Sequence, residues 1–127
     1  MKIPPPVAEL LGLELVSSAP GEVVMALEAE ERHENPMGFL QGGVICALAD
    51  GAMGFAFATT LDEGESFTTV ELKANFVRPF ATGRLVATGR VLSRGRTLGL
   101  TEAHVRDAEG RLIAHATSTC MTLRRSE

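Results

Sequence analysis

The run Asn35-Pro36-Met37-Gly38-Phe39-Leu40-Gln41-Gly42-Gly43 leads directly into an apolar segment, Val44 to Leu61, whose only charged residue is Asp50. The length of this segment after a glycine-rich turn predicts one long buried helix. A carboxylate inside such a helix is costly unless a partner or a reaction uses it. The two glycines at the predicted helix start leave backbone N–H groups unshielded. This combination is the outline of a catalytic site.

Length and charge limit the remaining possibilities. The 127-residue chain suits a single domain, 1–127, that buries about two-thirds of its extended surface on folding. A net charge of −4 argues against nucleic acid as a partner, because phosphate contacts need clustered basic residues. The arginines are concentrated in the C-terminal half, which leaves open a local site for an anion or an ordinary solvated strand face.

The location of the protein is predicted from its cysteines and its apolar segments. Cys46 and Cys120 lie in apolar runs without C-x-x-C spacing, so we expect reduced core residues in a cytoplasmic protein. No signal peptide is visible after Met1. We interpret Gly42 to Leu61 as a buried helix and not as a membrane span, because Asp50 would lie at the centre of that span.

The periodicity along the chain predicts an α+β fold. A short helix, Pro5 to Leu11, should direct Val7, Leu10 and Leu11 to one side. The expected strands are Leu13 to Val16, Glu22 to Glu30, Phe67 to Arg78, Arg84 to Ser93, Thr97 to Asp107, and Arg111 to Leu123. Alternation places Val70, Leu72, Ala74 and Phe76 together on one face of the third strand, and short connections predict antiparallel neighbours. A curved antiparallel sheet of five to six strands should therefore wrap the long central helix.

The predicted long helix has two distinct sides. Its bulky residues cluster on one side, whereas its small residues form a second strip, and Asp50 lies at the edge of that strip. The strip consists of Gly43, Ala47, Gly51, Gly54 and Ala58. Small residues allow close approach, so the strip should pack against the protein's own sheet or against a partner subunit. Two interpretations of Asp50 stay open: an acid in a cleft lined by a second chain, or a satisfied structural acid.

Most established catalytic motifs are missing from the sequence. It contains no G-x-S-x-G elbow, Walker loop or dinucleotide-binding glycine motif. His33, His104 and His115 have no metal-ligand spacing with the cysteines, so we expect ordinary histidines and no metal. Cys46 lacks an obvious base for a nucleophilic role. What remains is a carboxylate that could attack a carbonyl or activate water, and a helix start that could stabilise the resulting oxyanion.

Two motifs resemble a known family. They are Asn35-x-x-Gly38-x-x-Gln41-Gly42-Gly43 followed by Asp50, and Thr68-Thr69-Val70-Glu71-Leu72 leading to Phe76-x-Arg78-Pro79. From Leu10 to Leu123 the chain resembles the hotdog-fold acyl-CoA thioesterases of the phenylacetate-pathway (PaaI-like) type. The resemblance implies a homodimer, often paired into a tetramer. It also implies an acyl-CoA substrate and no separate cofactor.

The resemblance also assigns roles to single residues. The Gly42 N–H would polarise the thioester carbonyl, and Asp50 of the neighbouring subunit would be nucleophile or general base. Asn35 would position water or substrate, and Thr69 would help to orient the water. Many relatives carry His where this chain has Gln41, which can donate a hydrogen bond but cannot carry a proton at neutral pH.

The expected substrate contacts come from the helix start, the preceding loop and a strand turn. Arg94 and Arg96 resemble the positions near which such enzymes hold the CoA nucleotide. An apolar acyl group, aromatic or of medium length, would contact residues of the helix and its loop. The substrate-binding set is therefore Gly43, Met37, Phe39, Leu40, Met53, Phe57, Arg94 and Arg96. Two alternatives remain: a non-catalytic acyl-CoA-binding module, and a hotdog hydratase, which the lack of a histidine after Asp50 disfavours.

Overall fold

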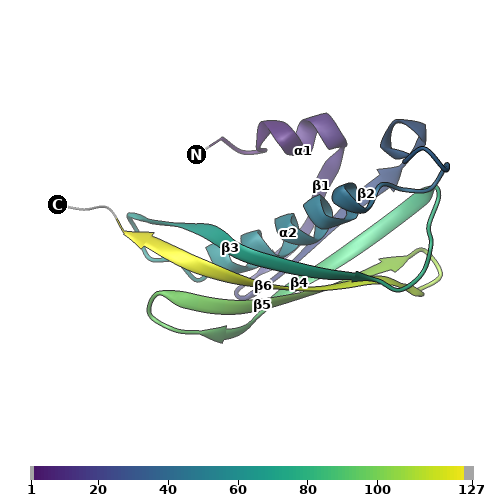
Figure 1. Ribbon diagram of the computed structural model, residues 1–127. Helices are drawn as coiled ribbons and strands as arrows, with labels where there is room; N and C mark the ends of the chain where they lie inside the picture. The colour runs from purple at the N-terminus through teal and green to yellow at the C-terminus, as the bar shows by residue number, and fades with distance from the viewer. Residues whose placement is uncertain (1, 125–127) are drawn as a thin grey trace.

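The computed structural model describes residues 2–124, in which one six-stranded antiparallel sheet curves around one long helix (Figure 1). Strand order is β1-β2-β4-β5-β6-β3. The elements are α1 Pro6–Leu11, β1 Leu13–Ala19, β2 Glu22–Ala29, the 3₁₀ helix η1 Glu31–His33, α2 Gly42–Ala58, β3 Glu65–Phe76, β4 Gly83–Arg94, β5 Leu98–Asp107 and β6 Leu112–Arg124. This is the predicted hotdog arrangement, with six strands.

The core lies between α2 and the concave face of the sheet. Alternate residues of β2, including Val23, Met25 and Leu27, are buried there, as their period-two pattern predicts. Helix and sheet backbones come into direct contact at Gly89 of β4, where a Cβ atom would lie 2.5 Å from the Ala52 carbonyl carbon. Only glycine permits this approach, which presses the middle of α2 onto the central strands.

The strand β3 corrects the expectation that strands joined by a short connection are neighbours. It does not neighbour β4 but pairs with β6 and forms one edge of the sheet. The chain leaves β3 in an extended form, and the N–H groups of Val77 and Arg78 both donate to the Ile113 carbonyl, at 2.9 and 3.3 Å. Because Pro79 restricts the preceding residue to extended backbone, the connection crosses the end of the sheet and does not turn back as a hairpin.

The apolar side of α1 is not its buried side. Ala8 is its buried residue, whereas Val7 and Leu10 are exposed. The helix has only six residues and lies against β1, so its contact needs just one small side chain. Gly12, with φ +80°, ends it in the left-handed conformation.

The central helix α2 ends three residues before the predicted Leu61. The hydroxyls of Thr59 and Thr60 donate to the carbonyls of Ala56 and Phe57, at 2.7 and 2.6 Å, and these local bonds accompany the end of the helix. No helix within residues 2–124 is both long and apolar enough to cross a membrane.

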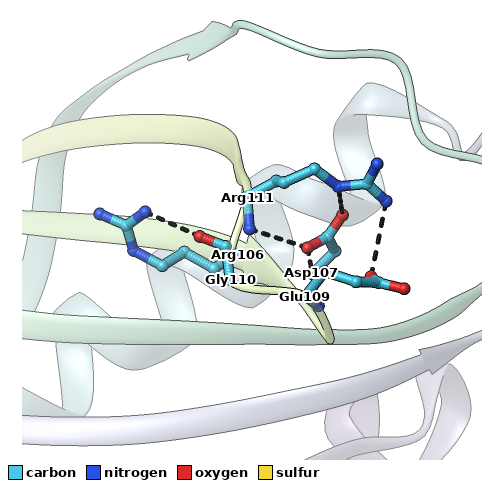
Figure 2. Close-up of polar contacts among 5 residues, drawn as sticks. All are labelled: Arg106, Asp107, Glu109, Gly110 and Arg111. Carbon is cyan, nitrogen blue, oxygen red and sulfur yellow. Dashed lines mark hydrogen bonds and ion pairs between the residues drawn. The ribbon is translucent and has the colours of Figure 1, made fainter.

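The tight turn between β5 and β6 is built around Asp107 (Figure 2). Its Oδ1 accepts hydrogen bonds from the N–H groups of Glu109 and Arg111, at 3.0 and 2.8 Å, and its Oδ2 accepts one from Arg111 Nε at 2.7 Å. Burial opposes ionisation of this carboxyl, but the two amides and the guanidinium outweigh burial and lower the pKa of Asp107. This short connection joins antiparallel neighbours, as predicted.

Candidate active site

Asp50 and Thr69 meet between α2 and the edge strand β3. Both are half-buried, and the Thr69 hydroxyl donates a hydrogen bond of 2.9 Å to Asp50 Oδ1. Asp50 also lines a cavity, so the carboxylate is reachable and is not sealed inside the core. Of the two interpretations of this acid, the cavity favours the one that places it in a cleft.

A β-bulge brings Thr69 to this position. The pairing of β3 with β6 shifts between Thr69 and Glu71, so that Thr69 faces Cys120 and Leu72 faces Ser118 on the helix side of the sheet. The inserted residue, Val70, is 55% exposed. The expected placement of Val70 with Leu72 is therefore wrong. Strict alternation would have turned Thr69 away from the helix, whereas the extra residue directs it toward Asp50.

The start of α2 presents the two glycine amides. The first helical hydrogen bonds run from the N–H groups of Val44 and Ile45 to the Gln41 carbonyl, so the Gly42 and Gly43 amides precede this ladder. A Cβ atom on Gly42 would lie 3.1 Å from the Phe76 ring, so packing explains this glycine. A Cβ atom on Gly43 would meet nothing within 4 Å, and packing within the chain does not explain it.

Gln41 precedes the two glycines as the N-cap residue of α2. Its side chain is exposed and makes no capping hydrogen bond within the described part of the chain. The Gln41 side chain therefore leaves the N–H groups at the start of α2 open.

The loop before α2 fixes the orientation of Asn35. Its Oδ1 accepts hydrogen bonds from the N–H groups of Met37 and Phe39, at 2.9 and 3.1 Å. These donors settle which end of the amide is oxygen, since the nitrogen cannot accept. No acceptor among residues 2–124 takes the two Nδ2 hydrogens. Asn35 thus keeps two donors for a ligand while its oxygen shapes the loop.

His33 anchors this loop, a role that its sequence pattern did not indicate. It is buried, its Nδ1 accepts the Glu30 N–H at 3.0 Å, and its Nε2 donates to the Leu11 carbonyl at 2.8 Å. Its own carbonyl accepts the Gln41 N–H at 2.9 Å. The ring therefore joins the end of α1 to the segment that enters α2. Only the three-dimensional position of Leu11 reveals this connection.

The glycine amides and the acid of one chain cannot act on the same bond. Eight residues separate Gly42 from Asp50, and a helix rises about 1.5 Å per residue, which places them about 12 Å apart along α2. A thioester carbonyl spans far less than this distance. Within one chain, the structure brings Asp50 together with Thr69, whereas Asn35 lies in the loop that leads to Gln41 and the glycine pair.

A cavity of about 250 Å³ opens beside Asp50. Small residues of α2 form one wall, β3 forms another, and the N-terminal segment covers it. The lining residues are Lys2, Ile3, Pro5, Asp50, Gly51, Gly54, Phe55, Ala58, Phe67 and Thr69. Apart from Asp50, Thr69 and Lys2, this surface is apolar. Gly51, Gly54 and Ala58 are the small residues of α2 along this wall. A Cβ atom on Gly51 would lie 3.1 Å from Met25 Sδ, and one on Gly54 would lie 3.3 Å from the Phe67 ring.

The residues predicted to contact the acyl group lie elsewhere in this chain. Met53 and Phe57 are fully buried between α2 and the sheet, and Leu40 belongs to the same core. Met37 and Phe39 are exposed on the loop before α2. Sequence reasoning missed Ile3, Phe55 and Phe67, although the small-residue strip of α2 did indicate where a cavity could form.

The two arginines proposed for the CoA nucleotide have different surroundings. The Arg94 guanidinium lies 4.7 Å from the centroid of the Phe57 ring, and its Nε donates to Thr60 Oγ1 at 2.8 Å, so it holds the end of α2. Arg96 is exposed at the same turn. Several other arginines pair with carboxylates on the strands: Arg84 with Glu14 and Glu28, Arg111 with Asp107, and Arg124 with Glu65.

Cys46 lies one helical turn before Asp50 and is a free thiol, as is the buried Cys120. Burial and, to a smaller extent, the charge of Asp50 raise the pKa of Cys46. A thiol with a raised pKa is a poor nucleophile near neutral pH. Asp50 is therefore the stronger candidate for the chemistry.

Comparison with known proteins gives consistent results. A family model described as the thioesterase superfamily matches residues 37–114. The chain is 34% identical over 107 residues to acyl-coenzyme A thioesterase 13 of Homo sapiens, covering 83% of this chain and 76% of that protein. It is 29% identical over 105 residues to 1,4-dihydroxy-2-naphthoyl-CoA hydrolase of Listeria monocytogenes, covering 83% and 85%. A solved phenylacetic acid degradation-related protein of Ralstonia eutropha superposes with a TM-score of 0.86 at 32% identity, covering 92% and 89%.

Proposed function

The chain belongs to the thioesterase superfamily and is a thioester hydrolase, and we propose that it cleaves acyl-CoA with Asp50 of one subunit and the helix start of another. Asp50 is the reacting carboxylate, held by Thr69. The Gly42 amide of the partner polarises the thioester carbonyl, with the Gly43 amide beside it. The single observation that carries this proposal is the reachable Asp50–Thr69 pair beside an apolar cavity.

The chemistry follows from these groups. Asp50 either attacks the carbonyl carbon or removes a proton from water that does so, and negative charge develops on the carbonyl oxygen. The N–H groups at the start of α2 stabilise this charge, aided by the positive end of the helix dipole. The carbon–sulfur bond then breaks, and the CoA thiolate takes up a proton. If water attacks, this step releases the acid directly; if Asp50 attacks, the acyl group stays on Asp50 as a mixed anhydride, which water then hydrolyses to release the acid and restore the carboxylate. Asn35 and Gln41 supply hydrogen-bond donors near the carbonyl.

Three features support a second copy of this chain as the source of the missing half. The acid and the amides lie too far apart along α2 to act together within one chain. The edge strand β3 is 12 residues long and pairs on only one side, with β6. Apolar side chains near that edge and near the helix start are exposed, at 77% for Met37, 44% for Phe39 and 52% for Phe76. Pairing of two β3 edges would continue the sheet and cover such residues.

The cavity beside Asp50 is the proposed acyl site. Its apolar walls and its volume of about 250 Å³ suit a compact aromatic or medium-length aliphatic group. Two relatives carry names that specify acyl-CoA substrates, one of them aromatic. Phe55, Phe67 and Ile3 would contact the acyl group, and CoA would extend outward past the partner's loop.

Complementation between two inactive variants tests this arrangement. Asp50→Asn removes the reacting carboxylate. Asn35→Asp removes only the free donors, because its carboxylate can still accept the Met37 and Phe39 amides. Each variant alone should lose at least about 100-fold in kcat on an acyl-CoA panel followed by thiol release. A mixed dimer contains one site with neither change, so equal mixing with subunit exchange should restore about one quarter of wild-type turnover.

The outcomes of this experiment separate the parts of the proposal. If mixing restores nothing although mixed dimers form, each site lies within one chain and the shared arrangement is wrong. If Asp50→Asn alone retains wild-type turnover, Asp50 is not the reacting group. Binding of acyl-CoA by the wild type without any thiol release would indicate a binding module.

A further inference from the structure

Two histidines and one glutamate meet on the convex face of the sheet, away from α2. His104 of β5 is the direct cross-strand partner of His115 of β6, and Glu102 lies two residues before His104 on the same face. The Nε2 atom of His115 is 3.0 Å from Oε2 of Glu102, and the centroids of the two imidazole rings are 5.0 Å apart. All three side chains are half-buried.

These separations match the geometry of a metal site. One ligand atom from each of the three residues lies within 4.8 Å of the other two. A tetrahedral Zn²⁺ with ligands at about 2.0–2.1 Å keeps its ligand atoms about 3.3 Å apart. Two imidazoles on such an ion have ring centroids about 5 Å apart, which is the separation between His104 and His115. Binding would therefore require only small rotations of the three side chains.

We propose that Glu102, His104 and His115 form a binding site for a divalent metal ion of the zinc type, a site separate from the thioesterase site. Two imidazoles and one carboxylate suit Zn²⁺, Co²⁺ or Ni²⁺ better than the oxygen-seeking Mg²⁺ or Ca²⁺. Three protein ligands leave one position for water. The site departs from the expectation of no metal, because sequence spacing cannot show which residues face each other across strands.

The surroundings of Glu102 support this role. Arg90, directly across from it on β4, places its Nε 3.8 Å from Oε1, which leaves Oε2 directed at His115. An outer partner of this kind fixes the orientation of a ligating carboxylate.

The backbone around the cluster is regular. Both strands lie inside the sheet, with β4 and β3 on their outer sides, and the pairing of β5 with β6 shows no register shift between Leu98 and Val105. Metal binding needs one proton rearrangement, since Nε2 of His115 donates to Glu102 in the metal-free protein. The proton moves to Nδ1 of the same ring, and the freed Nε2 lone pair becomes the ligand.

Titration of the wild-type protein with ZnCl₂ at pH 7.5, followed by calorimetry, tests the site. We expect saturable binding of a single ion per chain. We expect a weaker affinity for Zn²⁺ in each of three variants, His104→Gln, His115→Gln and Glu102→Gln. Loss of a residue that only orients a ligand lowers metal affinity roughly 10–100-fold, so loss of a ligand should lower it by at least that much. Glu28→Gln is the matched control, because Glu28 is an exposed carboxylate on the same face that pairs with Arg84 and has no histidine beside it. Its affinity for Zn²⁺ should equal that of the wild type.

A measurement on the unaltered protein guards against variants that fail to fold. In nitrogen-15 spectra of the imidazoles, Zn²⁺ should shift His104 and His115 and leave the buried His33 unchanged. Thiol release from acyl-CoA provides a check that each variant is folded. The proposal is overturned if Zn²⁺ shows no saturable binding, if the three variants bind it as the wild type does, or if the two imidazoles do not respond.

Discussion

Removal of the Thr69 hydroxyl separates an orienting role from a merely structural one. Thr69→Val keeps the shape of the side chain and deletes the 2.9 Å hydrogen bond to Asp50 Oδ1. A hydrogen bond to a charged group contributes about 1.5–3 kcal/mol. Water reaches both half-buried groups, so the lower end of this range applies. A loss of about 1.5 kcal/mol in the transition state lowers kcat roughly tenfold.

This effect should be smaller than that of Asp50→Asn, because Thr69 positions the carboxylate while Asp50 reacts. The assay is release of free CoA thiol at saturating substrate, with circular dichroism to verify folding. Thr69→Ser should recover most of the activity, because serine restores the hydroxyl.

The matched control for Thr69 is its neighbour in the same strand. Thr68 is an exposed residue whose side chain lies on the other face of β3, so Thr68→Val should leave kcat unchanged. Wild-type kcat in Thr69→Val would refute an orienting hydroxyl. A loss in Thr68→Val equal to that in Thr69→Val would show that the strand, and not the hydrogen bond, is responsible.

Further predictions concern stability and the start of α2. Gly89→Ala should destabilise by about 1–3 kcal/mol or more in urea unfolding, because its Cβ would lie 2.5 Å from Ala52 backbone. Gly43→Ala meets nothing within 4 Å and should leave the fold intact, yet lower kcat if partner or substrate occupies that space; unchanged kcat would contradict this. The lowered pKa of Asp107 means that its stabilising contribution is present above about pH 4, its unfolded pKa, and is lost as pH falls through the folded pKa. The Asp107→Asn variant should therefore have a lower free energy of unfolding at neutral pH, and this free energy should fall less steeply as the pH is lowered. If the variant loses stability below about pH 4 as steeply as the wild type does, the prediction is wrong.

Local patterns in the sequence predicted much of the fold. The helix α2 follows from an apolar run that begins at a glycine pair, and the buried face of β2 follows from alternation at Val23, Met25 and Leu27. Both signals depend on neighbouring residues alone. The family motif indicated the order of elements and named Asp50 and Thr69 as candidate site residues, and the structure adds the hydrogen bond between them.

Features that depend on distant pairing could not be predicted in this way. The position of β3 at the sheet edge depends on its pairing with β6, and the face of Thr69 depends on a bulge defined by that partner. A one-residue change in register exchanges the two faces of a strand, so alternation alone assigned Val70 to the wrong face.

The cavity shows a different limit of sequence reasoning. Bulky apolar residues of α2 were expected to bind the acyl group, but Met53 and Phe57 face the sheet and fill the core. The cavity lies instead beside the small residues Gly51 and Gly54 of α2, and Ile3 of the N-terminal segment also lines it. The sequence pattern identifies the bulky apolar residues of α2, but it does not show which of them line a cavity and which fill the core.

The two candidate sites of this protein depend on the same geometric property of one sheet. On β3 a bulge interrupts alternation, and a polar residue that would face outward turns toward the helix and meets Asp50. On β5 no bulge intervenes before Val105, so Glu102 and His104 both stay on the convex face and meet His115. The face on which a polar residue of the sheet lies is therefore decided by where the pairing shifts, and the chemistry available on each face follows from it.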